Sequence, residues 1–208
     1  MIIFDCEIKK MIQGRNERRL EGFDYCDGWG DYKGMGISVV CLYDLNTSTN
    51  YIIVEPDTDP VAREQLQSLL SHAPYVVGFN NHGFDNKLLD AHGIKVSDAK
   101  SYDIYEQVIK AAGLANAPFY ERKGYKLDDI ARANSLPRKT GEGGAQAPVM
   151  YQRGDLQRLH AYCMNDVKMT AEVMKLIMRN KLLCPRSSTV LPVDVPSFVL
   201  TGKQASLF

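Results

Sequence analysis

Four acidic residues stand in three separate segments of this chain, each where the sequence favours a regular element. Asp5 and Glu7 follow a short apolar run at the start of the chain, and Asp85 ends the segment VVGFNNHGFD. Asp166 stands four residues after Tyr162 in AYCMND, inside a long helical pattern. Residues two apart on a strand point to the same face, and residues four apart on a helix share one side. We therefore expect Asp5 to lie beside Glu7, and Tyr162 beside Asp166.

Four carboxylates gathered in one place repel one another unless cations lie between them. Oxygen-only ligand sets suit Mg²⁺ or Mn²⁺. Two such ions about 4 Å apart are a common device for the hydrolysis of phosphodiester bonds. If the fold brings the four acids together, the chain is predicted to bind two divalent cations and to cleave phosphodiesters. For any one of these residues taken alone, capping of a helix or packing in the core is the simpler interpretation.

At these positions the chain resembles the DEDD superfamily of 3′–5′ exonucleases, which have a ribonuclease H-like fold. The residues that match its three motifs, in chain order, are Asp5 and Glu7, then Asn81, Phe84 and Asp85, then Tyr162 and Asp166. A tyrosine four residues before the last aspartate is typical of the DEDDy branch. The sister branch has a histidine five residues before that aspartate, where this chain has Ala161. The resemblance covers about residues 1–180.

The resemblance implies a role for each acid. Asp5 would bridge both cations, Glu7 and Asp166 would complete the binding of one, and Asp85 would help to hold the other. Tyr162 would orient the attacking water through its hydroxyl, because a phenol with a reference pKa of about 10 is a poor general base at neutral pH.

Three residues of the second motif are candidate substrate-binding residues: Asn81, His82 and Phe84. Ordinary turn chemistry is an alternative for Asn81, and His82 is alternatively a solvated loop histidine. Two further acids, Asp103 and Asp128, precede or open predicted helices, and we expect them to cap those helices.

The chain departs from the commonest family pattern in two places. Ile8 stands where Thr or Ser is usual after the first motif, and a long segment rich in charge and glycine is inserted at 9–35. Trp29 and Phe23 in this insertion are candidates for stacking on a base, with a local cluster under the loop as the favoured alternative. Neither departure removes a predicted cation ligand, but both leave the substrate preference open.

The order of predicted elements agrees with a ribonuclease H-like α/β fold. Strands are predicted at Ile2–Phe4, Ile37–Tyr43, Tyr51–Val54 and Tyr75–Gly78. Helices are predicted at 61–71, 84–91, 103–112, 126–133 and 154–180. This order predicts a three-stranded antiparallel meander, followed by parallel strands reached through helices that flank a mixed sheet.

Composition favours an ordinary globular protein with one domain. We predict an exonuclease domain at 1–183 and an extended tail at 184–208, where prolines and small polar residues replace the periodic pattern. The five cysteines have no Cys-x-x-Cys spacing, which favours reduced, buried thiols and a cytoplasmic location. The formal net charge is zero, which argues against tight, non-specific binding to duplex nucleic acid.

The last five residues, QASLF, resemble the pentapeptide that binds bacterial sliding clamps, whose usual form is Gln-Leu-Ser/Asp-Leu-Phe. The resemblance implies a clamp as partner, bound through Gln204, Ser206, Leu207 and Phe208. In the alternative, Leu207 and Phe208 fold back onto the domain.

Together the two resemblances imply a 3′–5′ exonuclease that acts on single-stranded or frayed DNA in replication or repair. An RNA-trimming exonuclease and a non-catalytic adaptor with the same fold are the alternatives. The four retained acids argue against the adaptor, because a binding module gains nothing from their mutual repulsion.

Overall fold

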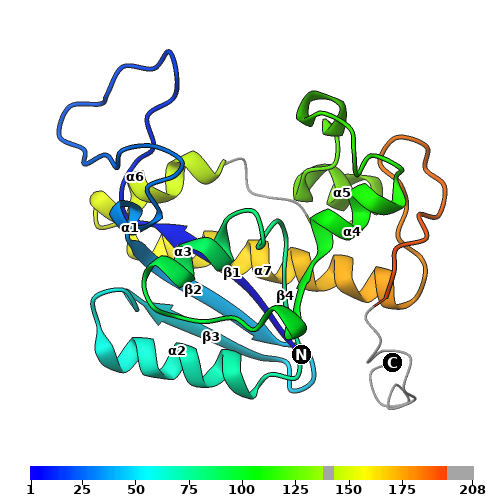
Figure 1. Ribbon diagram of the computed structural model, residues 1–208, viewed down its shortest axis with the longest axis horizontal. Helices are drawn as coiled ribbons and strands as arrows, with labels where there is room; N and C mark the ends of the chain where they lie inside the picture. Colours follow the sequence, from blue (N-terminus) through cyan, green and yellow to red (C-terminus); the bar gives the residue numbers. More distant parts are fainter. Residues whose placement is uncertain (138–142, 196–208) are drawn as a thin grey trace.

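The structure is a computed structural model that describes residues 1–137 and 143–195. A five-stranded mixed sheet forms its centre (Figure 1). The predicted clamp-binding residues Gln204, Ser206, Leu207 and Phe208 lie outside the described residues. The strands lie in the order β3-β2-β1-β4-β5. Their bounds are β1 Ile2–Ile8, β2 Ile37–Asp44, β3 Thr49–Val54, β4 Val76–Gly78 and β5 Ser101–Asp103.

The first three strands form an antiparallel meander, and β4 and β5 continue the sheet in parallel. Within the described residues seven α-helices flank this sheet. Their bounds are α1 Tyr32–Met35, α2 Pro60–His72, α3 Asp85–Ala91, α4 Ile104–Ala111, α5 Leu127–Ala133, α6 Ala147–Gln152 and α7 Leu156–Met178. The predicted ribonuclease H-like fold class is confirmed by this arrangement.

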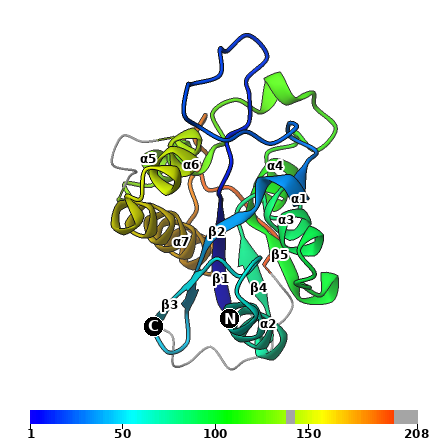
Figure 2. The same ribbon diagram turned by 90° about the vertical axis from the view of Figure 1, so that its left-hand side faces the viewer.

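The helices α5, α6 and α7 lie on one side of the sheet, and α1 and α3 lie on the other (Figure 2). Two separate apolar cores are present. One core contains buried residues of α2 and α3, and the other contains buried residues of α4, α5, α6 and α7. The strand β1 contributes to both, because successive side chains of a strand point to opposite faces. Ile3 belongs to the core beside α7, whereas Phe4 and Cys6 belong to the core beside α2 and α3. The odd-numbered residues Asp5 and Glu7 therefore face α7.

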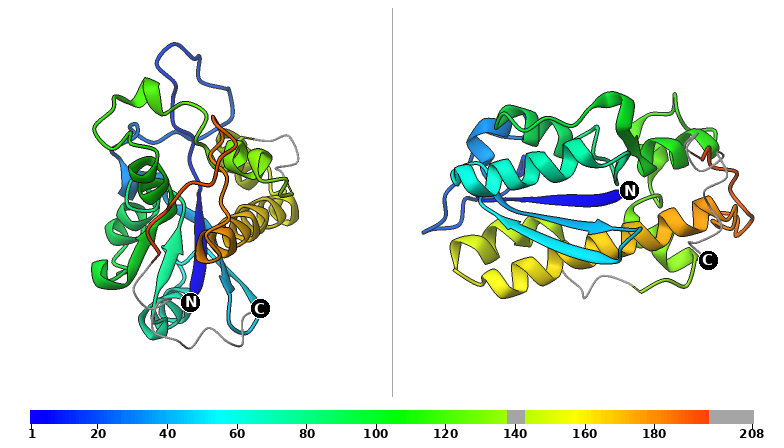
Figure 3. Two further views of the ribbon diagram at one scale, coloured as in Figure 1. Left: turned by 90° about the vertical axis from the view of Figure 1, so that its right-hand side faces the viewer. Right: turned by 90° about the horizontal axis from the view of Figure 1, so that it is seen from below.

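Several elements differ from the sequence-based expectations. The strand β1 extends to Ile8 rather than ending at Phe4, so Asp5 and Glu7 lie inside it. The strand β5 and the helix α6 were not predicted, because three and six residues are too few to produce a recognisable period. The segment 184–195 runs back toward β5 and α4 (Figure 3), where the Tyr102 hydroxyl donates to the Asp194 carbonyl at 2.6 Å.

All five cysteines are buried and free, as predicted. None of the helices in the described ranges has the length and apolar composition of a membrane-spanning segment.

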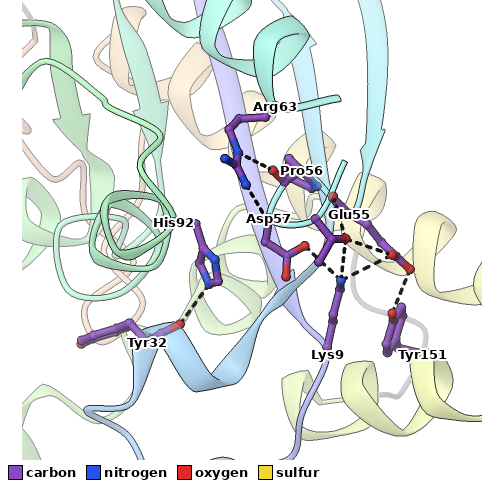
Figure 4. Close-up of polar contacts among 9 residues, drawn as sticks. Lys9, Tyr32, Glu55, Pro56, Asp57, Arg63, His92 and Tyr151 are labelled. Carbon is purple, nitrogen blue, oxygen red and sulfur yellow. Dashed lines mark hydrogen bonds and ion pairs between the residues drawn. The ribbon is translucent and has the colours of Figure 1, made fainter. Parts of the chain in front are cut away.

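A polar network fixes the chain directly after β1 (Figure 4). The Lys9 ammonium lies 3.0 Å from the Asp57 carboxylate and 3.4 Å from that of Glu55. The Tyr151 hydroxyl donates to the other oxygen of Glu55 at 2.8 Å. Only 14% of the Lys9 side chain and 6% of that of Asp57 are exposed. The network therefore ties the end of β1 to the segment before α2 and to α6.

We expect Lys9→Met to destabilise the protein by about 3 kcal/mol, because it leaves a buried carboxylate without its cation. The control is Lys95→Met, which removes an ion pair with Asp90 whose two side chains are 68% and 59% exposed. That change is expected to cost less than about 1 kcal/mol. Urea unfolding of both variants measures the difference, and equal losses would contradict a structural role for the Lys9 network.

Candidate active site

The first two predicted acids lie side by side on the central strand. Oxygen atoms of Asp5 and Glu7 and the sulfur of Cys163 all lie within 4.8 Å of one another. Asp5 is partly exposed, whereas Glu7 is 7% exposed. The predicted pairing of the two carboxylates on one face of β1 therefore occurs in the structure.

The long helix α7 covers this face of β1 and brings the third motif to it. Tyr162 and Asp166 are both buried, on the side of the helix that packs against the sheet. Between them Cys163 points at β1, with its sulfur 3.5 Å from the carbonyl oxygen of Asp5 and 3.8 Å from a carboxylate oxygen of the same residue. Sequence reasoning missed Cys163 as a neighbour of the acids, although its position next to Tyr162 is compatible with this contact.

The Asp85 side chain is hydrogen-bonded to the backbone of β1. The strand β4 pairs with β1 only at Ile2 and Ile3, so the edge of β1 is open beyond that point. Asp85, the first residue of α3, fills the opening and accepts a hydrogen bond from the Cys6 amide at 3.0 Å. Its carboxyl is buried, and this burial raises its pKa to about 7.

Three of the acids act electrostatically on the Cys6 thiol: its chain neighbours Asp5 and Glu7, and Asp85 from α3. Burial raises the pKa of the thiol, and the charges of Asp85, Asp5 and Glu7 raise that pKa further. All three carboxylates are therefore within electrostatic reach of one sulfur atom.

Asp103 fixes the turn that carries the second motif. Its carboxylate accepts from the backbone amides of Asn80 at 2.9 Å and His82 at 3.0 Å. It also caps α4, as predicted, by accepting from the amides of Tyr105 and Glu106. The capping role predicted for Asp128 is wrong, because Asp128 lies in the first turn of α5 and pairs with Arg132 at 3.8 Å.

The candidate substrate-binding residues occupy three different environments. Asn81 is fully buried and its amide donates to the Ser101 hydroxyl at 3.0 Å, an arrangement that supports the turn. The His82 ring contacts Glu106 at 2.8 Å and Ser101 at 2.9 Å. The ring of Phe84 packs against those of Tyr32 and Trp29, with centroids 6.0 and 6.3 Å away. Trp29 thus joins a local cluster, and Phe23 lies under the guanidinium of Arg153 at 5.4 Å.

A cleft of about 600 Å³ opens over the acids. Asp5 and Asp166 both line it, which brings the first and third motifs into one site. Its walls include Phe79, Asn80 and Tyr105 on one side, and Gly143 and Gly144 from the segment before α6. A Cβ atom on Gly144 would lie 3.8 Å from the Tyr162 hydroxyl oxygen, so the glycine lies directly beside that hydroxyl.

The donor set fits small divalent cations. Asp5, Glu7 and Asp166 offer carboxylate oxygens on facing elements, and Asp5 and Asp166 reach the cleft. Burial raises the pKa of the Cys163 thiol, which therefore stays protonated beside Asp5 and is a poor ligand for a hard cation. Asp85 does not belong to the group of atoms within 4.8 Å, and its bond to the Cys6 amide holds it on the adjacent edge of β1.

Comparisons with known proteins agree with this fold. A family model described as the RNase_H superfamily matches residues 30–178, more than half of the chain. The structure of the family B DNA polymerase from the hyperthermophilic archaeon Pyrobaculum calidifontis is similar, with 18% sequence identity and a TM-score of 0.56. The similarity covers 92% of this chain and 26% of that chain, so this chain spans about a quarter of the polymerase. No curated protein sequence matches.

The buried carboxyl of Asp85 predicts a pH dependence of stability. Its pKa is about 7 in the folded protein and about 3.9 in an unfolded chain. Between these values the folded state holds a proton that the unfolded state releases, so stability without metal falls as pH rises through this window. We expect Asp85→Asn to reduce this fall. Urea midpoints at pH 5, 6 and 8 in EDTA measure it, with the exposed Asp90→Asn on the same helix as control. An identical pH profile in both variants would contradict the assignment.

Proposed function

Because this chain belongs to the RNase H superfamily, we propose that it is a metal-dependent 3′–5′ exonuclease of the DEDDy type. The observation that carries the proposal is the cleft in which Asp5 and Asp166, from β1 and α7, lie together beside Glu7. Its substrate is the 3′ end of single-stranded or frayed DNA, and its products are nucleoside 5′-monophosphates.

Asp5, Glu7, Asp85 and Asp166 would hold two divalent cations, Mg²⁺ or Mn²⁺. When bound, such ions polarise the phosphate and lower the pKa of a water molecule. The protein's own contribution is the placement of the acids. The ladder of β1 with β2 fixes Asp5 and Glu7, the Cys6 amide orients Asp85, and the packing of α7 on the sheet sets the distance of Asp166 from them.

Tyr162 would orient the attacking water. Its ring is buried in the core beside α7, and its hydroxyl faces Gly144 at the wall of the cleft. A fixed hydroxyl contributes to rate through orientation, without any change in its own protonation.

DNA rather than RNA is the favoured substrate because the similar structure is that of a DNA polymerase. The clamp-binding pentapeptide, which motivated the same choice, stays a prediction from the sequence. RNA hydrolysis is the second outcome that the assays below distinguish.

Asp5→Asn is expected to abolish exonuclease activity while the fold is retained. The assay uses 5′-labelled DNA and RNA oligonucleotides with Mg²⁺ or Mn²⁺. EDTA is expected to abolish the activity of the wild type. Without metal the variant should be at least as stable as the wild type, because one of the clustered charges is gone. The control is Asp128→Asn, which alters a carboxylate that lines the same cleft but belongs to none of the three motifs. Full activity of Asp5→Asn would refute the mechanism.

Tyr162→Phe separates the hydroxyl from the packing of the ring. If the hydroxyl positions water, turnover is expected to fall about 10- to 1,000-fold, with little change in the metal concentration required for half-maximal rate. Single-turnover kinetics over a Mg²⁺ titration measure both quantities. An unchanged turnover rate would leave Tyr162 with a packing role alone.

A further inference from the structure

Two neighbouring aromatic side chains are largely exposed, and one of them lines the cleft. They lie in the segment 112–126 that connects α4 to α5, a segment found at the upper right of Figure 1. Phe119 is 79% exposed and Tyr120 is 66% exposed. Phe119 lines the same cleft as Asp5 and Asp166. An exposed pair of large rings at such a place indicates a surface that contacts another molecule.

The backbone that presents these rings is held by two arginines. Arg122 donates to the carbonyl oxygens of Ala117 at 3.0 Å and Ala115 at 2.9 Å. Arg186 donates to the carbonyl of Lys123 at 2.6 Å and also to that of Glu121, and its guanidinium lies 4.9 Å from the centre of the Tyr125 ring. The rim is therefore formed in advance, so a ligand that binds there does not have to order it.

The same rim carries two lysines. Lys123 and Lys126 are exposed and line the cleft, and no ion pair within residues 1–137 and 143–195 includes either of them. Asp128, the nearest acid in sequence that lines the cleft, pairs with Arg132. In a chain with zero net charge, the rim is thus locally positive and lies beside a group of acids.

We propose that Phe119, Tyr120, Lys123 and Lys126 form a binding site for the single-stranded segment that precedes the 3′ end of the substrate. This inference rests on the proposed function. Unpaired bases expose the faces that stack on aromatic rings, whereas the bases of a duplex are already stacked. The two ammonium groups contact the phosphates between those bases. The rim selects single strands over duplexes and extends the site beyond the nucleotide that is removed.

Binding is tested without catalysis, by fluorescence anisotropy of labelled single-stranded and duplex DNA in EDTA. Phe119→Ala combined with Tyr120→Ala is expected to weaken single-strand affinity about tenfold or more without a change in its salt dependence. Lys123→Gln combined with Lys126→Gln is expected to reduce the slope of log affinity against log salt by about 1.4. The controls are Val61→Ala, an exposed apolar residue on α2, and Lys168→Gln, an exposed lysine on α7. Wild-type affinity in the aromatic variant, or an equal loss for duplex DNA, would overturn the inference.

Hydrolysis separates this inference from the proposed function. With Mg²⁺, the aromatic variant is expected to raise KM for a 12-nucleotide strand about tenfold, with a smaller rise in KM for a trinucleotide that does not reach the rim. If the wild type hydrolyses neither strand, the proposed function fails, yet the affinities in EDTA still decide whether the rim binds single strands. If kcat falls equally for both strands, the aromatic pair affects catalysis at the acids, and the proposed binding site is refuted.

Discussion

Repulsion among the clustered carboxylates is the constraint on which the rest of the structure depends. Asp5 and Glu7 share one face of β1, and Asp85 and Asp166 approach the same strand from α3 and α7. Burial adds to the cost, because it disfavours the charged form of each carboxyl, as the raised pKa of Asp85 illustrates. Such a cluster persists only where the surrounding elements are fixed strongly enough to hold it.

The fold meets this requirement with a short strand and a long helix. Because β4 stops pairing with β1 after Ile3, the Cys6 amide remains available, and Asp85 uses it. A longer β4 would occupy that amide and exclude Asp85 from the sheet. On the opposite side, the long α7 buries a continuous apolar face against β1 and β2, so that Asp166 is positioned by many contacts distributed along the helix. The buried ion pair between Lys9 and Asp57 fixes the chain at the end of β1.

Under the proposed function, the distribution of charge would allow a neutral chain to bind a polyanion. Asp5 and Asp166 line the cleft, where divalent cations would reverse the local sign, and Lys123 and Lys126 lie at its rim. The guanidinium groups of Arg122 and Arg186 instead donate hydrogen bonds to backbone carbonyls, and these bonds fix the shape of the rim. Under the proposed function, attraction for a strand would therefore be local to the site, as expected of a protein that binds a few nucleotides rather than a long duplex.

The sequence by itself determined the relations that depend on spacing along one element. The two-residue step from Asp5 to Glu7 and the four-residue step from Tyr162 to Asp166 specify shared faces wherever a strand or a helix forms. The order of the longer elements was predictable for the same reason, whereas β5 and α6 are too short to produce a period.

Only the tertiary structure decided which distant segments meet. The bond from the Cys6 amide to Asp85 joins residues 79 positions apart, and the contact of Cys163 with Asp5 joins residues 158 apart. The placement of Phe119 at the cleft likewise depends on how Arg122 and Arg186 fold the connection between α4 and α5. No local pattern encodes these contacts, because they arise from the packing of whole helices on the sheet and from the point at which β4 ends.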